Sequence, residues 1–465
     1  MMLDDLQGRL DALLARSGVP GAALAVAVGD ELVEVAGGVL HLGTGARATT
    51  DSWFQIGSVT KVLTGTLIMQ LVDRGALGLD DPVRRHIPGF ALADELAAEA
   101  VTIRQLLSHT SGIDGDVFED LGTDDDSVRR YVEVLAGAAQ LHTPGAMFSY
   151  CNSGFTVLGR IVELHHGAPY ATVLREQLLE PLGVEGGTTA GEAIMRRSAV
   201  GHVGTPPVPA PVWCLPVSAT PAGATPMLST AGLVAFGRMH IAGGLAADGT
   251  RILSEKSVFA MRERTIAVPG GLQLGAMGLA WGLYERGDGI VLGHNGGTIG
   301  QYAFLRVHPE SGTVVALLTN GPHAGVLLRG LVEPLLAELT GLPTPPEPDL
   351  PAEPVPVDPG VEGIYQHRDN AITVRLDGAG VEVSVATRPG STAAALDDDS
   401  GPKRWLPADA DGDSVRFLSE EVTDGVREVM VFYGRMPDGR FGFSYSGGRA
   451  SPRTDGEPWP GWEAG

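Results

Sequence analysis

A serine and a lysine three residues apart, Ser58 and Lys61, are the first side chains in this chain that could do chemistry together. A long apolar segment begins beside them, and its spacing predicts a buried helix from about Val59 to Arg74. Residues three apart share a face of a helix, so the amine can lie beside the hydroxyl at the positive end of the helix dipole. A hydroxyl next to a potential base is what an activated serine nucleophile needs. A serine that only caps the helix, with a solvated lysine, is the alternative.

The same Ser-x-x-Lys pattern recurs at Ser400 and Lys403. Gly401 and Pro402 lie between these two residues and predict a loop rather than the start of a helix. Ser58 is therefore the candidate nucleophile.

A second polar cluster, Tyr150 and Asn152, follows a proline-glycine turn. Asn152 and the serine after it are predicted to cap an apolar helix from Phe155 to Leu164. A loop constrained in this way can present polar groups in fixed positions. A packed tyrosine beside a capping asparagine is the alternative. His109, at the end of a short helix upstream, is expected to hold its loop by hydrogen bonds rather than to act in catalysis.

A third cluster is His294-x-Gly296, where a strand that begins near Ile290 runs into a glycine-rich turn. A glycine-rich strand edge lets the backbone of a substrate approach and pair with it. His-x-Gly alone is a common pattern, so the ordered set carries the argument: serine and lysine on a helix, tyrosine on a capped loop, histidine on a strand.

The segments that must position these clusters predict an α/β (α+β) fold, an antiparallel sheet covered by helices. An amphipathic helix over residues 3–14 precedes two strands, 22–28 and 31–36, joined by a two-residue turn. Strands at 303–307 and 314–319 and a helix at 326–339 close this part. Seven prolines between residues 205 and 226 predict a long irregular loop, of the kind that forms lids or site walls.

A change in composition marks a second domain. Residues 343–359 hold eight prolines and four acidic residues, which predict a semi-rigid linker. Short alternating runs follow, separated by tight turns, and they predict a small antiparallel β-barrel. The clearest of these runs are residues 372–376, 381–385, 429–433 and 441–445. The predicted division is therefore a catalytic domain over residues 1–342, a linker over 343–359 and a barrel domain over 360–465.

Composition narrows the range of partners. The formal charge of −23 repels nucleic acid and anionic membranes, so neither is expected to bind. Two cysteines, Cys151 and Cys214, are too few for a disulfide framework and form no zinc-ribbon pattern. Neither a metal nor a cofactor is expected. The acidic N-terminus lacks the pattern of a secretory signal, and no apolar run of about 18 residues occurs. A cytoplasmic location is therefore expected.

Taken in order, the three clusters resemble the serine β-lactamase and penicillin-binding-protein superfamily, over roughly residues 5 to 340. The resemblance is to its class C-like branch. Class C β-lactamases carry Lys-Thr-Gly where this chain has His294-Asn295-Gly296, and histidine there is found in the esterases, D-amino-acid peptidases and stand-alone peptide-cyclising thioesterases of the superfamily. The C-terminal β segment is similar to the lipocalin-like domain found on several of these enzymes.

The resemblance implies a role for each matched residue. Ser58 would form the acyl-enzyme, and Lys61 would act as base once burial and a nearby positive group lower its pKa. Tyr150 would relay the proton to the leaving group. Asn152 would orient the acyl amide and Lys61, and His294 would influence Tyr150 electrostatically. The backbone N–H groups of Ser58 and Gly297 would form an oxyanion hole. Gly296, beside them, would contact the substrate.

Several functions remain open at this stage. The first is acyl transfer from an ester, thioester or amide to water or an amine, including cyclisation of a peptide that contains D-residues, with a carrier protein as a candidate partner. A D-stereospecific aminopeptidase and a small-ester esterase are alternatives within the same chemistry. A catalytically silent sensor of peptides or β-lactams is the alternative of another class.

The barrel domain offers one further candidate, Arg449. It lies with Arg440 and Arg453 in the final hairpin, a local excess of arginine in an acidic chain. We expect Arg449 to reach the cleft near Ser58 and to bind a substrate carboxylate through two hydrogen bonds. Pairing of these arginines with surface carboxylates of the protein is the alternative.

Overall fold

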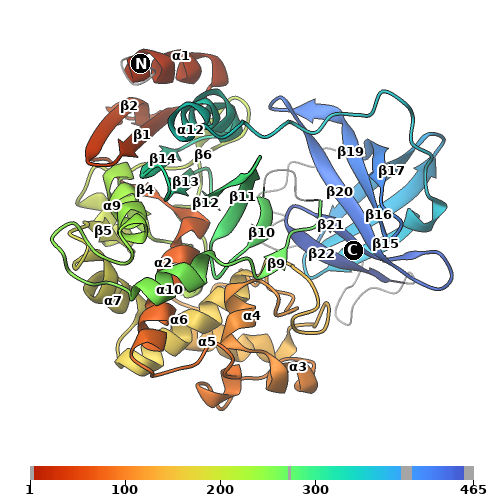
Figure 1. Cartoon of the computed structure of the whole chain (residues 1–465), viewed down its shortest axis with the longest axis horizontal. Helices are drawn as coiled ribbons and strands as arrows, with labels where there is room; N and C mark the ends of the chain where they lie inside the picture. Colours follow the sequence, from red (N-terminus) through yellow and green to blue (C-terminus); the bar gives the residue numbers. More distant parts are fainter. Residues whose placement is uncertain (1–4, 271–273, 389–400, 455–465) are drawn as a thin grey trace.

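The computed structural model describes residues 5–270, 274–388 and 401–454. A part built of helices around a nine-stranded sheet is followed by a closed eight-stranded barrel, and the two lie side by side (Figure 1). This is the predicted fold class, an antiparallel sheet covered by helices with a small antiparallel β-barrel after it.

The large sheet is antiparallel throughout, and its central strands are buried on both faces. In β1, Gly21–Val28, alternate residues enter different cores: Ala23 and Ala25 face one, and Leu24 and Val26 face the other. The strands follow the order β3-β2-β1-β14-β13-β12-β11-β10-β9. Their bounds are β2 Glu31–His41, β3 Ala46–Arg47, β9 Ile266–Ala267, β10 Leu274–Met277, β11 Gly282–Arg286, β12 Gly289–Gly297, β13 Tyr302–His308 and β14 Thr313–Thr319.

Helices cover both faces of this sheet. The first and last helices pack on one face, and the larger helical layer packs on the other (Figure 1). The predicted helix at 326–339 is interrupted by a π-helical turn, Leu328–Val332, which separates the last two helices. The helices are α1 Leu6–Ser17, α2 Thr60–Asp73, α3 Glu95–Ala100, α4 Ile103–Leu107, α5 Ser127–Val134, α6 Asn152–His166, α7 Tyr170–Leu174, α8 Ala190–Ile194, α9 Thr230–Ile241, α10 Glu255–Arg262, α11 Ala324–Leu327 and α12 Glu333–Thr340.

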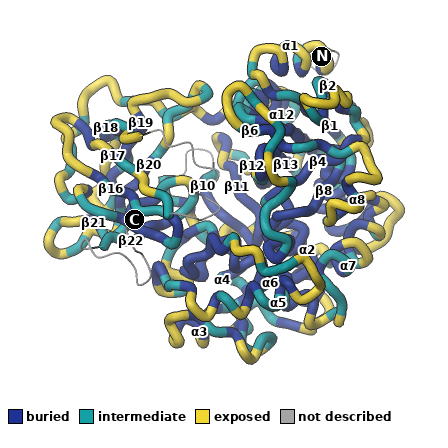
Figure 2. Tube along the Cα trace, turned by 180° about the vertical axis from the view of Figure 1, so that it is seen from behind, coloured by how far each residue is buried: buried dark blue, intermediate teal, exposed yellow. Residues whose placement is uncertain are grey.

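Helix α2 lies at the centre of the larger layer, where all but its last two residues are buried (Figure 2). Short paired strands complete this part of the fold. They are β4 Phe54–Gln55, β5 Gly186–Gly187 and β8 Met227–Leu228 in one small sheet, and β6 His202–Val203 with β7 Val208–Pro209 in another. The helices in the described part of the chain include none that is long and apolar enough to cross a membrane.

The barrel encloses its own apolar core, with Trp405, Phe417 and Phe432 among the residues inside. The four expected runs lie in β16, β17, β20 and β21, while β15, β18 and β19 lack a clear alternating pattern and were not predicted. The strands are β15 Gly363–His367, β16 Asn370–Asp377, β17 Gly380–Thr387, β18 Lys403–Ala410, β19 Ser414–Thr423, β20 Val426–Arg435, β21 Phe441–Ser446 and β22 Arg449–Thr454.

A separate apolar cluster joins the barrel to the helical part. It combines residues from the loop before α6, from the β9–β10 edge of the sheet and from barrel strands β20 and β21. Its buried members are Phe148, Val268, Met277, Val431 and Tyr445. The apolar contact holds the barrel against the same loop that carries Tyr150.

Candidate active site

Ser58 and Lys61 meet as their spacing predicts. Ser58 lies in a 3-10 turn, Gly57–Val59, that leads directly into α2, and Lys61 lies in the first turn of that helix. The Lys61 Nζ is 3.0 Å from the Ser58 Oγ, and it donates to the carbonyl oxygen of Ala222 at 2.6 Å. Ala222 belongs to the proline-rich loop, so this loop forms a wall of the site.

Lys61 can be a base near neutral pH. Its side chain is completely buried, and burial lowers its pKa to about 7 because the charged form loses its hydration. The charge of Arg449 lowers the pKa further, while the charge of Asp116 opposes the shift. A large fraction of Lys61 is therefore neutral at pH 7, as a general base requires.

The glycine-rich end of β12 lies directly against the serine turn. A side chain at Gly296 would place its Cβ 2.0 Å from the carbonyl oxygen of Ile56 and 3.1 Å from the backbone nitrogen of Ser58. Gly57 has a positive φ of 51°, and a Cβ there would lie 2.5 Å from the backbone nitrogen of Gly297. Only glycine permits this approach, which brings the backbone N–H groups of Ser58 and Gly297 together as an oxyanion hole needs.

One edge of β12 is open beside the site. Strand β11 pairs with β12 only as far as Gly293, whereas β13 pairs with β12 up to Gly297. Residues 294–297 therefore extend past β11, with backbone groups that a substrate strand can pair with.

The Tyr150 loop is held by backbone and side-chain contacts from both sides. The Nδ1 of His109 accepts a hydrogen bond from the backbone nitrogen of Cys151 at 3.0 Å, and its ring stacks on Tyr150 with centroids 4.2 Å apart. His109 thus has the expected loop-holding role. The predicted cap was wrong: α6 begins at Asn152, and the Cys151 Sγ accepts from the nitrogen of Gly154. Asn152 is consequently inside the helix, and its side chain is free to make other contacts.

Tyr150 stays protonated near neutral pH. Burial raises the pKa of its phenol well above the ordinary value, against the effects of a hydrogen bond with Ser58 and of the charge of Arg449. The Lys61 Nζ lies 4.9 Å from the centroid of the Tyr150 ring. A neutral amine and a neutral phenol therefore flank the Ser58 hydroxyl.

His294 lies across from Tyr150, with ring centroids 6.2 Å apart. Burial, together with the charge of Lys61, lowers its pKa to about 3, so the imidazole is neutral. Its Nδ1–H donates to the carbonyl oxygen of Asn295 at 2.6 Å, which leaves Nε2 as an acceptor. Any influence of His294 on Tyr150 is therefore that of a dipole and an acceptor, not of a positive charge.

Asn152 contacts a residue that the sequence did not suggest. Its Nδ2 donates to Asp116 Oδ1 at 2.6 Å, whereas the Lys61 Nζ donates to Ser58 and to Ala222. Asp116 is 8% exposed and lies on the loop that follows α4. No motif includes it, and two aspartates around a glycine in a polar loop give no signal of their own.

The barrel completes the site through the turn between β21 and β22. The carbonyl oxygen of Gly448 accepts from the backbone nitrogen of Tyr150 at 2.9 Å, and the nitrogen of Ala450 donates to the Ser149 Oγ at 3.2 Å. Arg449 lies over the Tyr150 ring, with its guanidinium carbon 5.4 Å from the centroid. Arg449 therefore reaches the site, as expected.

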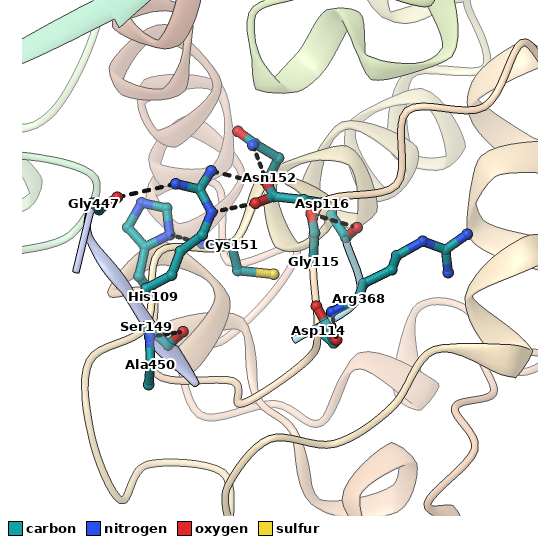
Figure 3. A network of polar contacts seen from close by, with 12 residues as sticks. His109, Asp114, Gly115, Asp116, Ser149, Cys151, Asn152, Arg368, Gly447 and Ala450 are labelled. Carbon is teal, nitrogen blue, oxygen red and sulfur yellow. Dashed lines mark hydrogen bonds and ion pairs between the residues drawn. The ribbon is translucent and has the colours of Figure 1, made fainter. Parts of the chain in front are cut away.

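Arg449 and Asn152 share one acceptor, the Asp116 carboxylate, and Figure 3 shows Asn152 beside it. Arg449 binds Asp116 through Nε and, at 3.0 Å, through Nη2, and its Nη1 donates to the carbonyl oxygen of Gly447 at 3.1 Å. The two other arginines of the hairpin serve the barrel: Arg453 donates to carbonyl groups within it, and Arg440 pairs with Asp438. Arg449 therefore does pair with a carboxylate of the protein, but this carboxylate lies in the site and not on the surface.

One further expectation concerns the second Ser-x-x-Lys pattern. Ser400, of the second Ser-x-x-Lys pattern, lies outside the described residues, and Lys403 begins strand β18 of the barrel. Within residues 5–270, 274–388 and 401–454, no group of three or more His, Cys, Asp or Glu side chains is placed to hold a metal ion.

A buried lysine beside a serine, a protonated tyrosine and two converging N–H groups can form and break an acyl-serine bond. In agreement, the family model described as Beta-lactamase matches residues 6–332. The chain therefore belongs to the β-lactamase family of serine hydrolases.

Individual relatives extend this match. Penicillin-binding protein 4 of Amycolatopsis lactamdurans is 46% identical over 373 residues, which cover 78% of this chain and 98% of that protein. The crystal structure of SurE matches with a TM-score of 0.77 at 29% identity, over 97% of this chain and 99% of SurE, and SurE with D-Leu matches with a TM-score of 0.74. A D-amino acid amidase from Ochrobactrum anthropi SV3 matches with a TM-score of 0.59 at 26% identity, over 69% of this chain and 92% of the amidase.

Proposed function

We propose that this chain is a serine acyl-enzyme hydrolase and acyltransferase that acts on an ester, thioester or amide of a peptide containing D-residues. The contact that carries the proposal is the 3.0 Å distance between the Ser58 Oγ and the Nζ of a completely buried Lys61. Burial lowers the pKa of Lys61 to about 7, and a buried amine with a lowered pKa beside a serine hydroxyl supports a role as base.

In the proposed reaction, the Ser58 Oγ attacks the acyl carbon while its proton passes to the neutral Lys61 amine. The N–H groups of Ser58 and Gly297 bind the negative oxygen that forms. Tyr150 then donates its phenolic proton to the leaving group, the acyl bond to that group breaks, and Lys61 returns a proton to Tyr150. Water or an amine attacks the acyl-serine through the same groups in reverse order.

The relatives support a D-configured acyl donor. SurE has been crystallised with D-Leu, and the amidase is named for D-amino acids. A peptide thioester on a carrier protein is the donor we propose for cyclisation, with a free amine of the same peptide as nucleophile. D-stereospecific amide hydrolysis is the second candidate, favoured by the amidase match.

The experiment is intact-protein mass measurement after incubation with p-nitrophenyl esters, D-amino-acid amides and peptide thioesters. We expect an acyl adduct on wild type and none on Ser58→Ala. The variant should keep its fold, because losing a hydroxyl at a helix start costs only about 1 kcal/mol. An adduct on Ser58→Ala, or no adduct and no product with any donor on wild type, would refute the proposal; the second outcome would favour a silent sensor.

We also propose that Arg449 binds a substrate carboxylate. A guanidinium has five N–H donors, and described residues use three of them on Arg449, so one on each Nη nitrogen is left for a ligand. Arg449→Ala should lower kcat/KM about tenfold more for carboxylate-bearing peptide esters than for esters without a carboxylate. Amidated counterparts of the same esters are the matched controls, and equal losses for both members of a pair would exclude this role.

A further inference from the structure

Asp116 connects the catalytic loop of the helical part with the barrel. Its Oδ1 accepts from the Asn152 Nδ2 at 2.6 Å and from the Arg449 Nη2 at 3.0 Å, and its Oδ2 accepts from the Arg449 Nε. The three donors belong to two residues far apart in the chain, Asn152 at the start of α6 and Arg449 at the start of β22. One buried carboxylate is thus the shared acceptor of the Asn152 amide and of Arg449, the barrel arginine that lies over Tyr150.

This carboxylate remains ionised. Burial alone would raise its pKa, but the charge and hydrogen bonds of Arg449, with smaller effects of His367 and Asn152, hold the pKa of Asp116 below its ordinary value. An ionised carboxylate only accepts hydrogen bonds. The group of Asn152 that faces it must therefore be the NH2, and the carbonyl oxygen must face away, as Figure 3 shows.

The orientation of this amide has a chemical consequence. The Asn152 Oδ1 makes no hydrogen bond with the described residues, so it is an acceptor available to a bound molecule. Peptide acyl donors carry an N–H close to the reacting carbonyl, whereas a simple aliphatic ester does not. An amide locked with its oxygen outward would favour the first kind of donor over the second.

We propose that Asp116 is a positioning residue that fixes the Asn152 amide with its oxygen toward the acyl donor, and so selects donors that carry an N–H. This inference rests on the proposed acyl-enzyme function. Asp116 does not touch the substrate and acts through Asn152. Arg449, which the docked barrel supplies, keeps the Asp116 carboxylate ionised.

The test compares two esters with the same leaving group, N-acetyl-D-alanine p-nitrophenyl ester and p-nitrophenyl butyrate. Asp116→Asn replaces an acceptor-only group by an amide that can also donate, so the Asn152 amide is free to turn. We expect the ratio of kcat/KM values, N-acetyl-D-alanine ester over butyrate, to fall by about tenfold, the loss of one hydrogen bond of this type. Asp116→Glu, which keeps an acceptor-only charge, should retain more of the ratio than Asp116→Asn.

A double-mutant comparison separates positioning from general damage. Asn152→Ala should lose the preference by itself, and adding Asp116→Asn should lower the ratio no further. Glu119→Gln is the matched control, because Glu119 pairs with Arg368 of the barrel across the same interface without touching the site; its ratio should stay at the wild-type value.

The outcomes are distinguishable. If both esters lose activity equally in Asp116→Asn, or if the ratio falls further in the double variant, Asp116 does not act through Asn152 and the inference is wrong while the proposed function stands. If wild type forms no acyl adduct with either ester, both are wrong. If Asp116→Asn does not fold by circular dichroism, Asp116→Glu decides: a ratio as low as that of Asn152→Ala in a folded Asp116→Glu protein would refute the inference.

Discussion

Burial moves the pKa values of Lys61 and Tyr150 in opposite directions, and this makes them complementary. The charged form of lysine and the charged form of tyrosine both lose hydration inside the protein, so the lysine pKa falls to about 7 and the tyrosine pKa rises. At neutral pH the site then holds an amine that can accept a proton and a phenol that can donate one. Two groups with separated pKa values are what general acid and base roles require.

The first prediction at this scale is a pH profile. Because Lys61 must be neutral to accept the Ser58 proton, kcat/KM should rise with pH through about 7 and fall by about tenfold per unit well below it. The measurement is hydrolysis of p-nitrophenyl butyrate from about pH 5 to about pH 9. If His294 were the base, the fall in rate would instead lie near pH 3, the pKa of His294. A profile that is flat down to about pH 5 would therefore show that Lys61 is not the base.

At the scale of elements, the loop after α4 is where the barrel rests on the helical part. Asp114 of this loop is buried, and its Oδ2 accepts from the backbone nitrogen of Arg368 in the barrel at 2.6 Å. Burial, and then the charge of Asp116, raises the pKa of Asp114 to about 7. Above about pH 7 the buried Asp114 carboxylate is therefore ionised, which lowers the stability of the folded protein.

The sign of the resulting pH dependence follows from proton binding. Between about pH 4 and about pH 7 the folded protein holds a proton on Asp114 that the unfolded chain has released, so this residue makes stability fall as pH rises through that window. Asp114→Asn should therefore raise the melting temperature at about pH 8 and have little effect at about pH 4. Melting curves at both pH values test this, with Glu119→Gln as the control for losing a carboxylate from the same loop; equal shifts at both pH values would contradict it.

The same elements show how far sequence reasoning reaches. Ser58, Lys61, Tyr150 and His294 converge because each is fixed to a helix, loop or strand whose pattern is readable locally. Asp116 was missed because its partners lie in distant elements and nothing in its own neighbourhood requires them. The cap of α6 was misassigned because Cys151 is an uncommon cap, while an asparagine at that position is a common one.

The barrel shows the same limit. Strands with alternating apolar residues, such as β16 and β17, were predicted, but β18 and β19 carry charged and polar residues at many positions and become strands only through pairing with their neighbours. Apart from the expectation that Arg449 reaches the cleft, the docking of the barrel could not be predicted, since it depends on how two folded surfaces fit together.

At the scale of the whole molecule, the active site is shared between two folded parts. The apolar cluster around Phe148 and Tyr445 joins them, and the turn at Gly448 adds a backbone hydrogen bond to Tyr150. The barrel therefore supplies one wall of the site and an arginine over Tyr150. Its position should control turnover even for substrates that do not touch it, because a displacement of about 1 Å at a reacting group can cost a hundredfold in rate.

Two glycines of the barrel allow this to be tested with a matched pair. Gly448 and Gly439 both have a left-handed φ, of 85° and 86°, so a valine is strained at each position, by about 1–2 kcal/mol. A Cβ at Gly448 would lie 3.6 Å from the Tyr150 Cβ, whereas a Cβ at Gly439 would meet no atom within 4 Å. The methyl groups of a valine at position 448 would press on the tyrosine, and those at position 439 would enter open space.

We expect Gly448→Val and Gly439→Val to lose similar amounts of melting temperature, because a valine is strained at both positions. Only Gly448→Val should lose activity, by about tenfold or more in kcat/KM for p-nitrophenyl butyrate, since it displaces the Tyr150 phenol from the Ser58 hydroxyl. The readouts are thermal melting and ester hydrolysis on the full chain. Equal activity in the two variants would mean that the barrel can shift without moving Tyr150, and that the site is formed by the helical part alone.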